Sequence, residues 1–193
     1  MKYANFVHLH THSQYSLLDG ACRIDSVIEL AKEYKMPALA ITDHGNMFGA
    51  IDFYNKATKA GIKPIIGCEA YVAGGNRFEK KPSNQYPDGG YHLILLVKNE
   101  TGYRNLMKLA SAAYLEGFYF RPRMDKELLR RHSEGLIATS ACLKGEVNWH
   151  LERGDVDAAV ASARELQDIF GEGNFYLEIQ NHGLDKEQLI LPK

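Results

Sequence analysis

Three histidines lie at alternate positions near the start of the chain, at His8, His10 and His12, and Asp19 follows them. Residues 5–10 predict a short strand, because aromatic and β-branched side chains favour a pleated, half-buried surface. Side chains alternate between the two faces of a strand, so the three imidazoles would share one face. A single histidine at a strand edge is usually only solvated, but three with a nearby carboxylate favour a metal site.

More residues of metal-binding type recur along the chain, each near an expected strand. The strands are expected at residues 38–41, 64–72, 91–98, 135–140 and 174–180, and the residues are His44, Glu69, His92, Cys142 and His182. In parallel barrels the loops after the strands converge on one face, where the active site lies. His92 differs from the others, since it lies near the start of its strand. Together with the N-terminal histidines and Asp19, this recurrence predicts one shared metal site.

The mixture of side chains restricts the metal and the chemistry. Imidazoles and carboxylates with at most one thiol suit Zn, Mn or Fe, and they differ from a Cys-rich structural zinc site. Such groups can hold two or three ions, with a carboxylate such as Glu69 bridging, and can activate water at a phosphoryl centre. The sequence contains no Gly-x-x-x-x-Gly-Lys phosphate loop and no Gly-x-Ser-x-Gly nucleophile elbow. Metal-assisted hydrolysis is therefore the chemistry that the residues favour.

Expected strands alternate with expected helices throughout the chain. Apolar residues at helical spacing predict helices at residues 24–36, 47–60, 99–115, 125–132, 143–153, 155–170 and 184–193. This alternation predicts an α/β fold with a parallel sheet or barrel of six strand–helix units. Residues 74–90 form a long, turn-rich connection that carries Arg77, Lys80 and Lys81. We expect this connection to be a mobile rim around the site, because loops of that length are usually functional or disordered.

The composition is that of an ordinary globular chain. A length of 193 residues predicts one domain, and a net charge of −1 gives no global basic field, so any contact with nucleic acid must be local. No apolar run is long enough to span a membrane, and the first residues lack the apolar core of a signal peptide. We therefore expect a cytoplasmic protein without a membrane partner. Cys22, Cys68 and Cys142 are few and far apart, which disfavours a disulfide framework.

One connection combines aromatic and basic residues, since residues 117–123 read Gly-Phe-Tyr-Phe-Arg-Pro-Arg. Arg121 and Arg123 could bind phosphate through paired N–H donors. Exposed arginine pairs are more often only solvated, so phosphate binding is the less common of the two interpretations.

Several segments together match one family, and they are residues 6–13, 15–20, 40–46, 63–71, 114–118 and 176–183. On these segments the sequence resembles the polymerase-and-histidinol-phosphatase (PHP) domain, in the form that begins the alpha subunit of bacterial DNA polymerase III. The resemblance implies a distorted (β/α)7 TIM-like barrel that holds two to three divalent ions of Zn, Mn or Fe. It implies that His8 is not a ligand, and that the ligands are His10, His12, Asp19, His44, Glu69, His92 and Cys142.

The resemblance also implies a function. It is a metal-dependent phosphodiesterase or 3′→5′ exonuclease site within a DNA-directed DNA polymerase, which is a nucleotidyltransferase of DNA replication. Catalysis through the bound metals would involve His12, Asp19, His44 and Glu69. We expect His182, Arg121 and Arg123 to contact the substrate. The expected partners are the primer 3′ end, the rest of the polymerase chain, a proofreading subunit and other replisome subunits.

The family closes its site with an Asp-x-His pair on a last strand, and this chain ends at Lys193 before such a pair. We therefore expect residues 1–193 to be a PHP domain incomplete at its C-terminus, without the last strand and without palm, fingers and thumb. Such a chain would bind metal weakly and have little activity. Two alternatives stay open: a scaffold domain that metals only stabilise, and a free-standing phosphatase acting, for example, on histidinol phosphate. Residues 114–118 and 178–183 disfavour the phosphatase.

Overall fold

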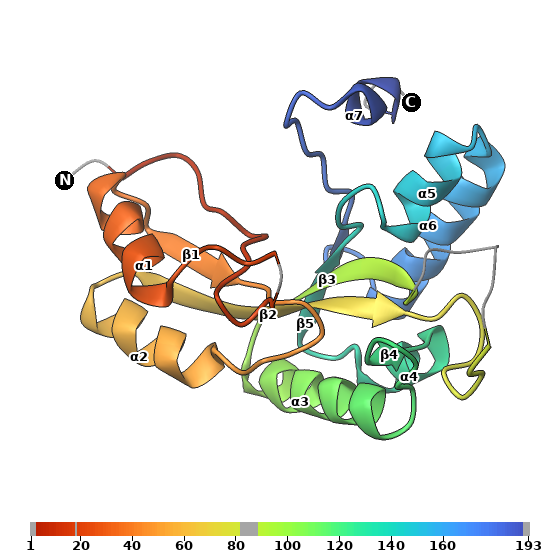
Figure 1. Cartoon of the computed structure of the whole chain (residues 1–193), viewed down its shortest axis with the longest axis horizontal. Helices are drawn as coiled ribbons and strands as arrows, with labels where there is room; N and C mark the ends of the chain where they lie inside the picture. Colours follow the sequence, from red (N-terminus) through yellow and green to blue (C-terminus); the bar gives the residue numbers. More distant parts are fainter. Residues whose placement is uncertain (1–2, 18, 82–88, 191–193) are drawn as a thin grey trace.

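The structure, a computed structural model, describes residues 3–17, 19–81 and 89–190, so part of the expected rim, residues 82–88, lies outside the described residues. The strands are β1 (Ala38–Ile41), β2 (Lys63–Val72), β3 (Tyr91–Val97), β4 (Arg123–Met124), β5 (Leu136–Thr139) and β6 (Phe175–Tyr176). The helices are α1 (Ile24–Glu33), α2 (Ala50–Lys59), α3 (Glu100–Leu115), α4 (Lys126–His132), α5 (Glu146–Glu152), α6 (Val156–Phe170) and α7 (Asp185–Ile190). The predicted α/β alternation is confirmed (Figure 1). Among the described residues, no helix is both long and apolar enough to cross a bilayer.

The strands form one mixed sheet in the order β1-β2-β3-β5-β6, with β4 also paired to β2. The pairs β1–β2, β2–β4 and β5–β6 are parallel, whereas β3 is antiparallel to both β2 and β5. The expectation of a parallel sheet is therefore wrong at β3. A parallel return needs a crossover, usually a helix, and the described part of the β2–β3 connection contains none. A TIM-like barrel, expected here without its last strand, is not shown, since the sheet of the described residues is open.

The two chain segments that flank this sheet are more irregular than predicted. Residues 5–10 form no strand, although the segment runs beside β1 and the amide of Ala40 donates to the carbonyl of His8 at 3.0 Å. The amide of Thr11 donates to the hydroxyl of Thr42 at 2.9 Å, so a side chain interrupts the backbone ladder. Residues 174–180 likewise keep only the two-residue strand β6. The open edges of the sheet lie at these two segments.

Side-chain caps set the start of three helices. The side chain of Asn99 accepts from the amide of Gly102 before α3, and that of Asp125 accepts from Leu128 before α4. Asp155 does the same for α6. A cap of this kind satisfies one of the amides that the first helical turn leaves unpaired, which is why these helices begin where they do.

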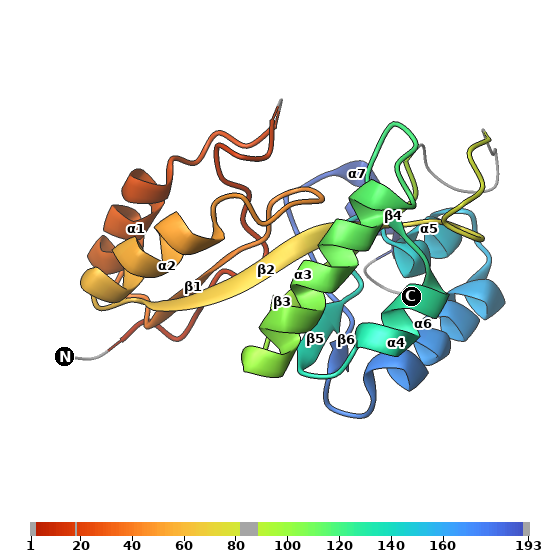
Figure 2. The ribbon, with the colours of Figure 1, turned by 90° about the horizontal axis from the view of Figure 1, so that it is seen from below.

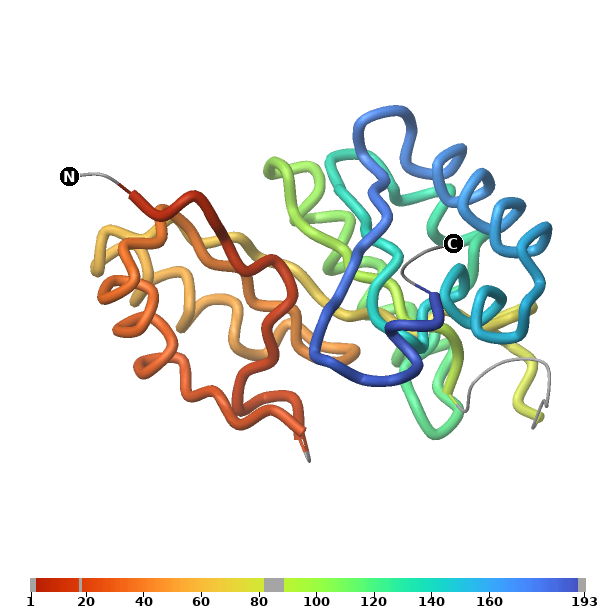
Figure 3. The backbone as a smooth tube through the Cα atoms, turned by 90° about the horizontal axis from the view of Figure 1, so that it is seen from above, coloured from red at the N-terminus to blue at the C-terminus, as the bar shows by residue number. Residues whose placement is uncertain are grey.

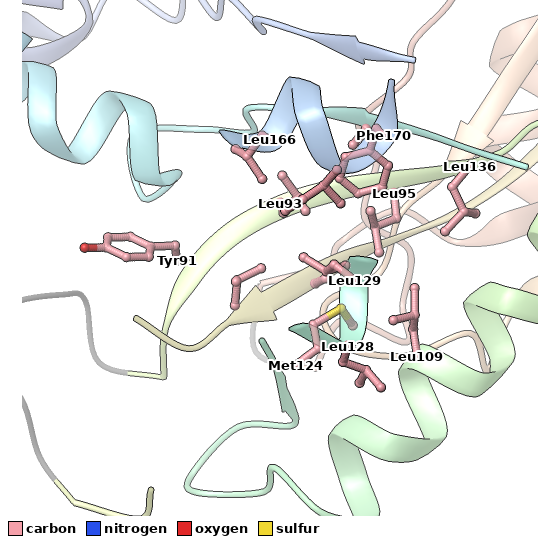
Figure 4. Packing of buried hydrophobic residues seen from close by; sticks show 14 of the residues in the cluster. Tyr91, Leu93, Leu95, Leu109, Met124, Leu128, Leu129, Leu136, Leu166 and Phe170 are labelled. Carbon is pink, nitrogen blue, oxygen red and sulfur yellow. The ribbon is translucent and has the colours of Figure 1, made fainter. Parts of the chain in front are cut away.

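β2 runs through two hydrophobic cores. The first core packs α1, α2 and β1 around Phe53 and ends on β2 at Ile66. The second core begins on β2 at Cys68 and packs β3 and β5 against α3, α4 and α6. Gly67 lies between them, where an added Cβ would approach the carbonyl oxygen of Leu95 to 2.6 Å. Figures 2 and 3 show α1 and α2 at one end of the molecule and α3 to α6 at the other. Figure 4 shows part of the second core, with labelled side chains from β3, α3, α4 and α6.

Candidate metal centre

The carboxylate of Glu69 on β2 lies at the centre of a group of imidazoles. The side chain is 1% exposed. Its Oε2 lies 2.6 Å from Nε2 of His12 and 3.2 Å from Nε2 of His10. The same oxygen lies 3.1 Å from Nδ1 of His44, and Oε1 lies 2.5 Å from Nδ1 of His92. Four imidazoles from three parts of the chain therefore face one buried carboxylate.

Asp19 and Cys142 extend this group on two sides. Oδ2 of Asp19 lies 2.6 Å from Nε2 of His44 and 3.7 Å from Nδ1 of His12, and the Asp19 side chain is half exposed. Sγ of Cys142 lies 3.6 Å from Nδ1 of His92 and 3.8 Å from Oε1 of Glu69. The cluster thus runs from an exposed carboxylate to a half-buried thiol.

The donor set fits divalent ions. The ligand atoms of three overlapping groups lie within 4.8 Å of one another, and the groups are His10–His12–Glu69, His12–Asp19–His44 and His44–Glu69–His92. Because His12, His44 and Glu69 each belong to two groups, neighbouring ions could share them. Nδ1 of His44 is buried and, within the described residues, takes part in no hydrogen bond. Buried polar atoms are nearly always hydrogen-bonded, so this nitrogen is better explained as a ligand of a metal ion.

The residue before His44 holds the loop that carries the N-terminal ligands. Asp43 is buried, and its carboxylate accepts from the amide of Ser13 at 2.6 Å, from the Ser13 hydroxyl at 2.8 Å and from the Ser16 hydroxyl at 2.7 Å. The hydroxyl of Ser16 in turn accepts from the amide of His44 at 3.0 Å. Consecutive side chains after a strand diverge, so Asp43 fixes the 13–16 turn while His44 faces Glu69.

His92 is the second residue of β3, and it reaches the cluster because β3 runs antiparallel to β2. Tyr71 near the end of β2 pairs with His92. Since β3 runs antiparallel to β2, the start of β3 lies at the same edge of the sheet as the end of β2. In a parallel sheet a ligand at the start of a strand would lie at the opposite edge from the site. Because β3 is antiparallel, the start of the strand is where a ligand must lie to reach the site.

A tight turn after β5 places Cys142. Ala141 is fully buried and has a φ of 57°, a left-handed conformation that is uncommon outside glycine. At Gly145 an added Cβ would lie 1.9 Å from the carbonyl oxygen of Ser140, so only glycine fits. The carbonyl of Lys144 accepts from the amide of His92 at 3.0 Å. This bond ties the turn directly to the strand that carries His92.

Burial and hydrogen bonds set the charges of the cluster. Burial alone would raise the pKa of Glu69, but bonds from His10, His12 and His92 outweigh burial and hold its pKa far below the ordinary value. Burial opposes protonation of His10, yet hydrogen bonds to Glu178 and Glu69 raise its pKa to about 9. Burial lowers the pKa of His44 and raises that of the Cys142 thiol to about 11. The Glu69 carboxylate is thus ionised at neutral pH, as metal ligation requires.

A cleft of about 350 Å³ opens onto the cluster, and it brings together residues that are far apart in the sequence. Its lining contains all seven implied ligands and His182, together with Lys144 and Gln180. His182 is exposed, and its Nδ1 lies 2.7 Å from Oε1 of the buried Glu187. Convergence at a single site is therefore confirmed as geometry, whereas the role of each residue stays a prediction.

Three residues of the site were missed by sequence reasoning. Lys144 and Gln180 line the cleft, and Oε1 of Glu178 lies 2.7 Å from Nδ1 of His10. Glu178, Gln180 and His182 alternate along the chain, so the period-2 pattern of the expected strand could have placed all three on one face. Lys144 carries no comparable signal.

Arg121 and Arg123, the two arginines expected to bind phosphate, differ in exposure to solvent. Arg123 is 1% exposed, and its guanidinium donates to the carbonyls of Gly117 and Glu79 at 3.1 and 2.8 Å, so it is not available to a phosphate. Arg121 is exposed. Arg77, expected at the rim, is also buried and pairs with Asp125 at 3.1 Å.

Comparison with known proteins places this geometry in one family. The sequence matches the PHP domain over residues 8–182. The chain belongs to the PHP domain family. It is 51% identical over 187 residues to the DNA polymerase III subunit alpha of Thermus aquaticus, a match that covers 96% of this chain and 15% of that protein. It is 50% identical over 191 residues to the corresponding subunit of Treponema pallidum, covering 97% and 16%.

The PHP domain also has a structural counterpart. A crystal structure of a candidate metal-dependent phosphoesterase from Bifidobacterium adolescentis aligns with a TM-score of 0.52 at 13% identity, covering 99% of this chain and 84% of that chain. At this identity the likeness shows the fold alone. The polymerase subunits are much longer than this PHP domain, which spans about one sixth of their length.

Proposed function

We propose that this PHP domain is the N-terminal part of a bacterial DNA polymerase III alpha subunit, and that its cleft hydrolyses phosphodiester bonds at DNA 3′ ends. The identity of about half to polymerase subunits supports the first part. The observation that carries the second is the convergence of four imidazoles on the buried Glu69 carboxylate, with Asp19 and Cys142 beside them. A site that only supported the fold would not need an open cleft over its ligands.

The residues that would hold two or three ions of Zn, Mn or Fe are His10, His12, Asp19, His44, Glu69, His92 and Cys142. When bound, such ions lower the pKa of a water ligand and offset the charge that develops on a phosphodiester. Glu69 contributes a carboxylate that is ionised at neutral pH and reaches imidazoles on both of its oxygens. Asp19, half exposed at the mouth of the cleft, contributes the most accessible ligand.

Residues outside the ligand set would handle the substrate. Lys144 is the one primary amine among the described residues that line the cleft, so its charge would attract a phosphate. Nδ1 of His182 is occupied by Glu187, which leaves Nε2 for a substrate oxygen. Arg121 would add a second cation near the mouth. The partners under this proposal are the primer 3′ end and the rest of the polymerase chain, with a proofreading subunit and other replisome subunits, in the bacterial cytoplasm.

The test uses the polymerase subunit that carries this domain, a primer with a mismatched 3′ end, and Mn²⁺ or Zn²⁺ without nucleoside triphosphates. His12→Ala removes a ligand shared by two of the metal groups. His8→Ala is the matched control, because His8 is an exposed histidine of the same segment that does not line the cleft. We expect nucleotide release from the parent and from His8→Ala, and a loss of at least about 100-fold in His12→Ala.

The alternative, a metal-stabilised scaffold, gives a different result. In that case none of the three proteins releases nucleotides, while His12→Ala loses bound metal and melts at a lower temperature. Equal release by His12→Ala and by the parent would contradict the proposed catalytic site.

A further inference from the structure

The connection between α3 and β4 presents an aromatic ring to solvent under strain. Phe120 is 77% exposed and has a φ of 58°. A bulky residue rarely adopts this left-handed conformation, which costs on the order of 1–3 kcal/mol and tends to occur at functional sites. Burial of the ring cannot compensate, because the ring is not buried. Figure 2 shows this connection extending beyond the end of α3.

The strained residue lies in a turn that is anchored on both sides, at Gly117 and at Arg123. The buried guanidinium of Arg123 binds the carbonyl of Gly117, and it lies 5.2 Å from the ring centroid of Tyr119. The amide of Tyr119 donates to the carbonyl of Arg121 at 3.0 Å, closing a tight turn around Phe120. The turn therefore fixes the backbone at Phe120, and the exposed ring meets the Tyr119 ring edge to face with 4.6 Å between centroids.

This loop lies against the metal cluster. At Gly45, directly after His44, an added Cβ would lie 2.7 Å from Cγ of Pro122, so the loop and the ligand-bearing turn are in close contact. The guanidinium of Arg121 lies 5.8 Å from the ring centroid of Tyr71. The Tyr71 ring is itself 5.1 Å from the His92 ring and 5.8 Å from the His44 ring, centroid to centroid. One aromatic side chain thus separates Arg121 from two of the implied ligands.

Apart from its contact with the Tyr71 ring, the Arg121 guanidinium is open to a ligand. Within the described ranges its side chain forms no ion pair and donates no hydrogen bond, and it is exposed. The guanidinium fork matches phosphate geometry, whereas an exposed aromatic face matches a nucleobase. Adjacent residues of one rigid turn therefore offer the two chemistries of a nucleotide side by side.

We propose that Phe120 and Arg121 position the unpaired end of a nucleic-acid strand, Phe120 by stacking on a base and Arg121 by binding the adjoining phosphate. The inference rests on the proposed function and deepens it, since it names the side chains that hold the unpaired end of the substrate strand. A base inside a duplex has both faces stacked, so the Phe120 ring can reach only a frayed or mismatched base. Stacking is tolerant of sequence, and the preference would be for unpaired ends of any sequence.

The first experiment measures KM for nucleotide release, using the assay of the proposed function, on a normal mismatched primer and on one whose terminal nucleotides are abasic. The parent should favour the primer with bases by roughly fivefold or more in KM. Phe120→Ala should lose this preference with little change in kcat, and Phe120→Trp should keep it. Phe78→Ala, which removes another exposed phenylalanine, is the matched control and should behave as the parent. Retention of the preference in Phe120→Ala would overturn the inference.

The second experiment does not depend on hydrolysis, so it separates this inference from the proposed function. Phe120→Trp is combined with Trp149→Phe in the present chain, whose sequence holds one tryptophan, which leaves a single indole as the reporter. Adding a single-stranded oligothymidylate without metal should quench its fluorescence saturably, and a blunt duplex should not. Quenching in a protein that releases no nucleotide would leave the stacking site standing while the proposed hydrolysis fails. Fluorescence unchanged by single strands would refute the stacking site.

Discussion

Glu178 accepts a hydrogen bond from His10, with 2.7 Å between Oε1 and Nδ1, and the two residues are 168 positions apart. The other nitrogen of the same ring, Nε2, lies 3.2 Å from Oε2 of Glu69. Glu178 is itself fixed, because Oε2 takes a short bond from Thr139 and Oε1 accepts from Gln180 at 2.7 Å. A carboxylate behind a histidine ligand sets the tautomer and the orientation of the ring.

Glu178→Gln should therefore weaken metal binding although Glu178 is outside the implied ligand set. The amide cannot match the charge of the carboxylate behind His10, so we expect a loss of about 10- to 100-fold in affinity for Mn²⁺ or Zn²⁺, measured by competition with a chelator. Glu172→Gln, at an exposed position near the same strand, is the control and should bind as the parent does. Equal affinities in both variants would contradict the role of Glu178.

Metal should stabilise the domain through the cluster. A saturating ion that binds only the folded state adds about 2.7 kcal/mol at 100 times its Kd, which corresponds to a rise of about 5–10 °C in melting temperature for a chain of this size. His44→Ala should lose most of that rise, since His44 belongs to two of the three ligand groups. His132→Ala, on α4, should retain it. Thermal unfolding with and without Mn²⁺ gives the comparison.

The stability of the domain should be sensitive to truncation of side chains at the centre of the second core. Leu106 on α3 is fully buried, so Leu106→Ala leaves a cavity and should cost about 2–5 kcal/mol of unfolding free energy, measured by urea denaturation. Leu115→Ala on the same helix is the control. That side chain is 84% exposed, and its removal should change the free energy by less than about 0.5 kcal/mol.

Low pH should weaken the buried ion pair between Arg77 and Asp125. Burial alone would raise the pKa of Asp125, but bonds from Arg77 and from the amide of Leu128 outweigh burial and lower it. A carboxyl whose pKa is lower in the folded state contributes stability that is present above its unfolded pKa and is lost as the pH falls through the folded pKa. We therefore expect the unfolding free energy to decline below about pH 4.

Asp125→Asn tests this assignment. The variant should lose about 1–3 kcal/mol at neutral pH, the cost of a buried hydrogen-bond partner, and should depend less on pH in the acid range. Asp168→Asn, at an exposed position on α6, should follow the parent at every pH. Parallel acid profiles for Asp125→Asn and the parent would assign the acid sensitivity to other groups.

Convergence of the site could be predicted because it depends on residue type and on the regular alternation of strands and helices. β1 forms at the expected residues, and His44 follows it as expected. Strand direction could not be predicted in the same way, because local propensity is the same for parallel and antiparallel neighbours. The antiparallel pairing of β3 with β2 places Tyr71 opposite His92, and His92 acquires its position from that reversal.

Other parts of the site depend on tertiary contacts that no short pattern encodes. Arg123 and Arg121 are two residues apart in one basic motif, yet one is buried among backbone carbonyls and the other is exposed. The barrel stays a prediction, because closure requires pairing between the ends of the sheet and the sheet of the described residues is open. Residues 5–10 and 177–181, which flank those ends, form too few backbone bonds to define strands.

Because β2 leaves one hydrophobic core and enters the other at Gly67, bound metal would affect how the two cores unfold. His12, Asp19 and His44 belong to the part of the chain that packs with the first core, His92 and Cys142 belong to the second, and Glu69 follows directly after the join. Ions shared by these side chains would crosslink the part of the chain that packs in the first core to the part that packs in the second. Removal of the ions by a chelator would then uncouple the unfolding of the two cores, and a single melting transition would separate into two.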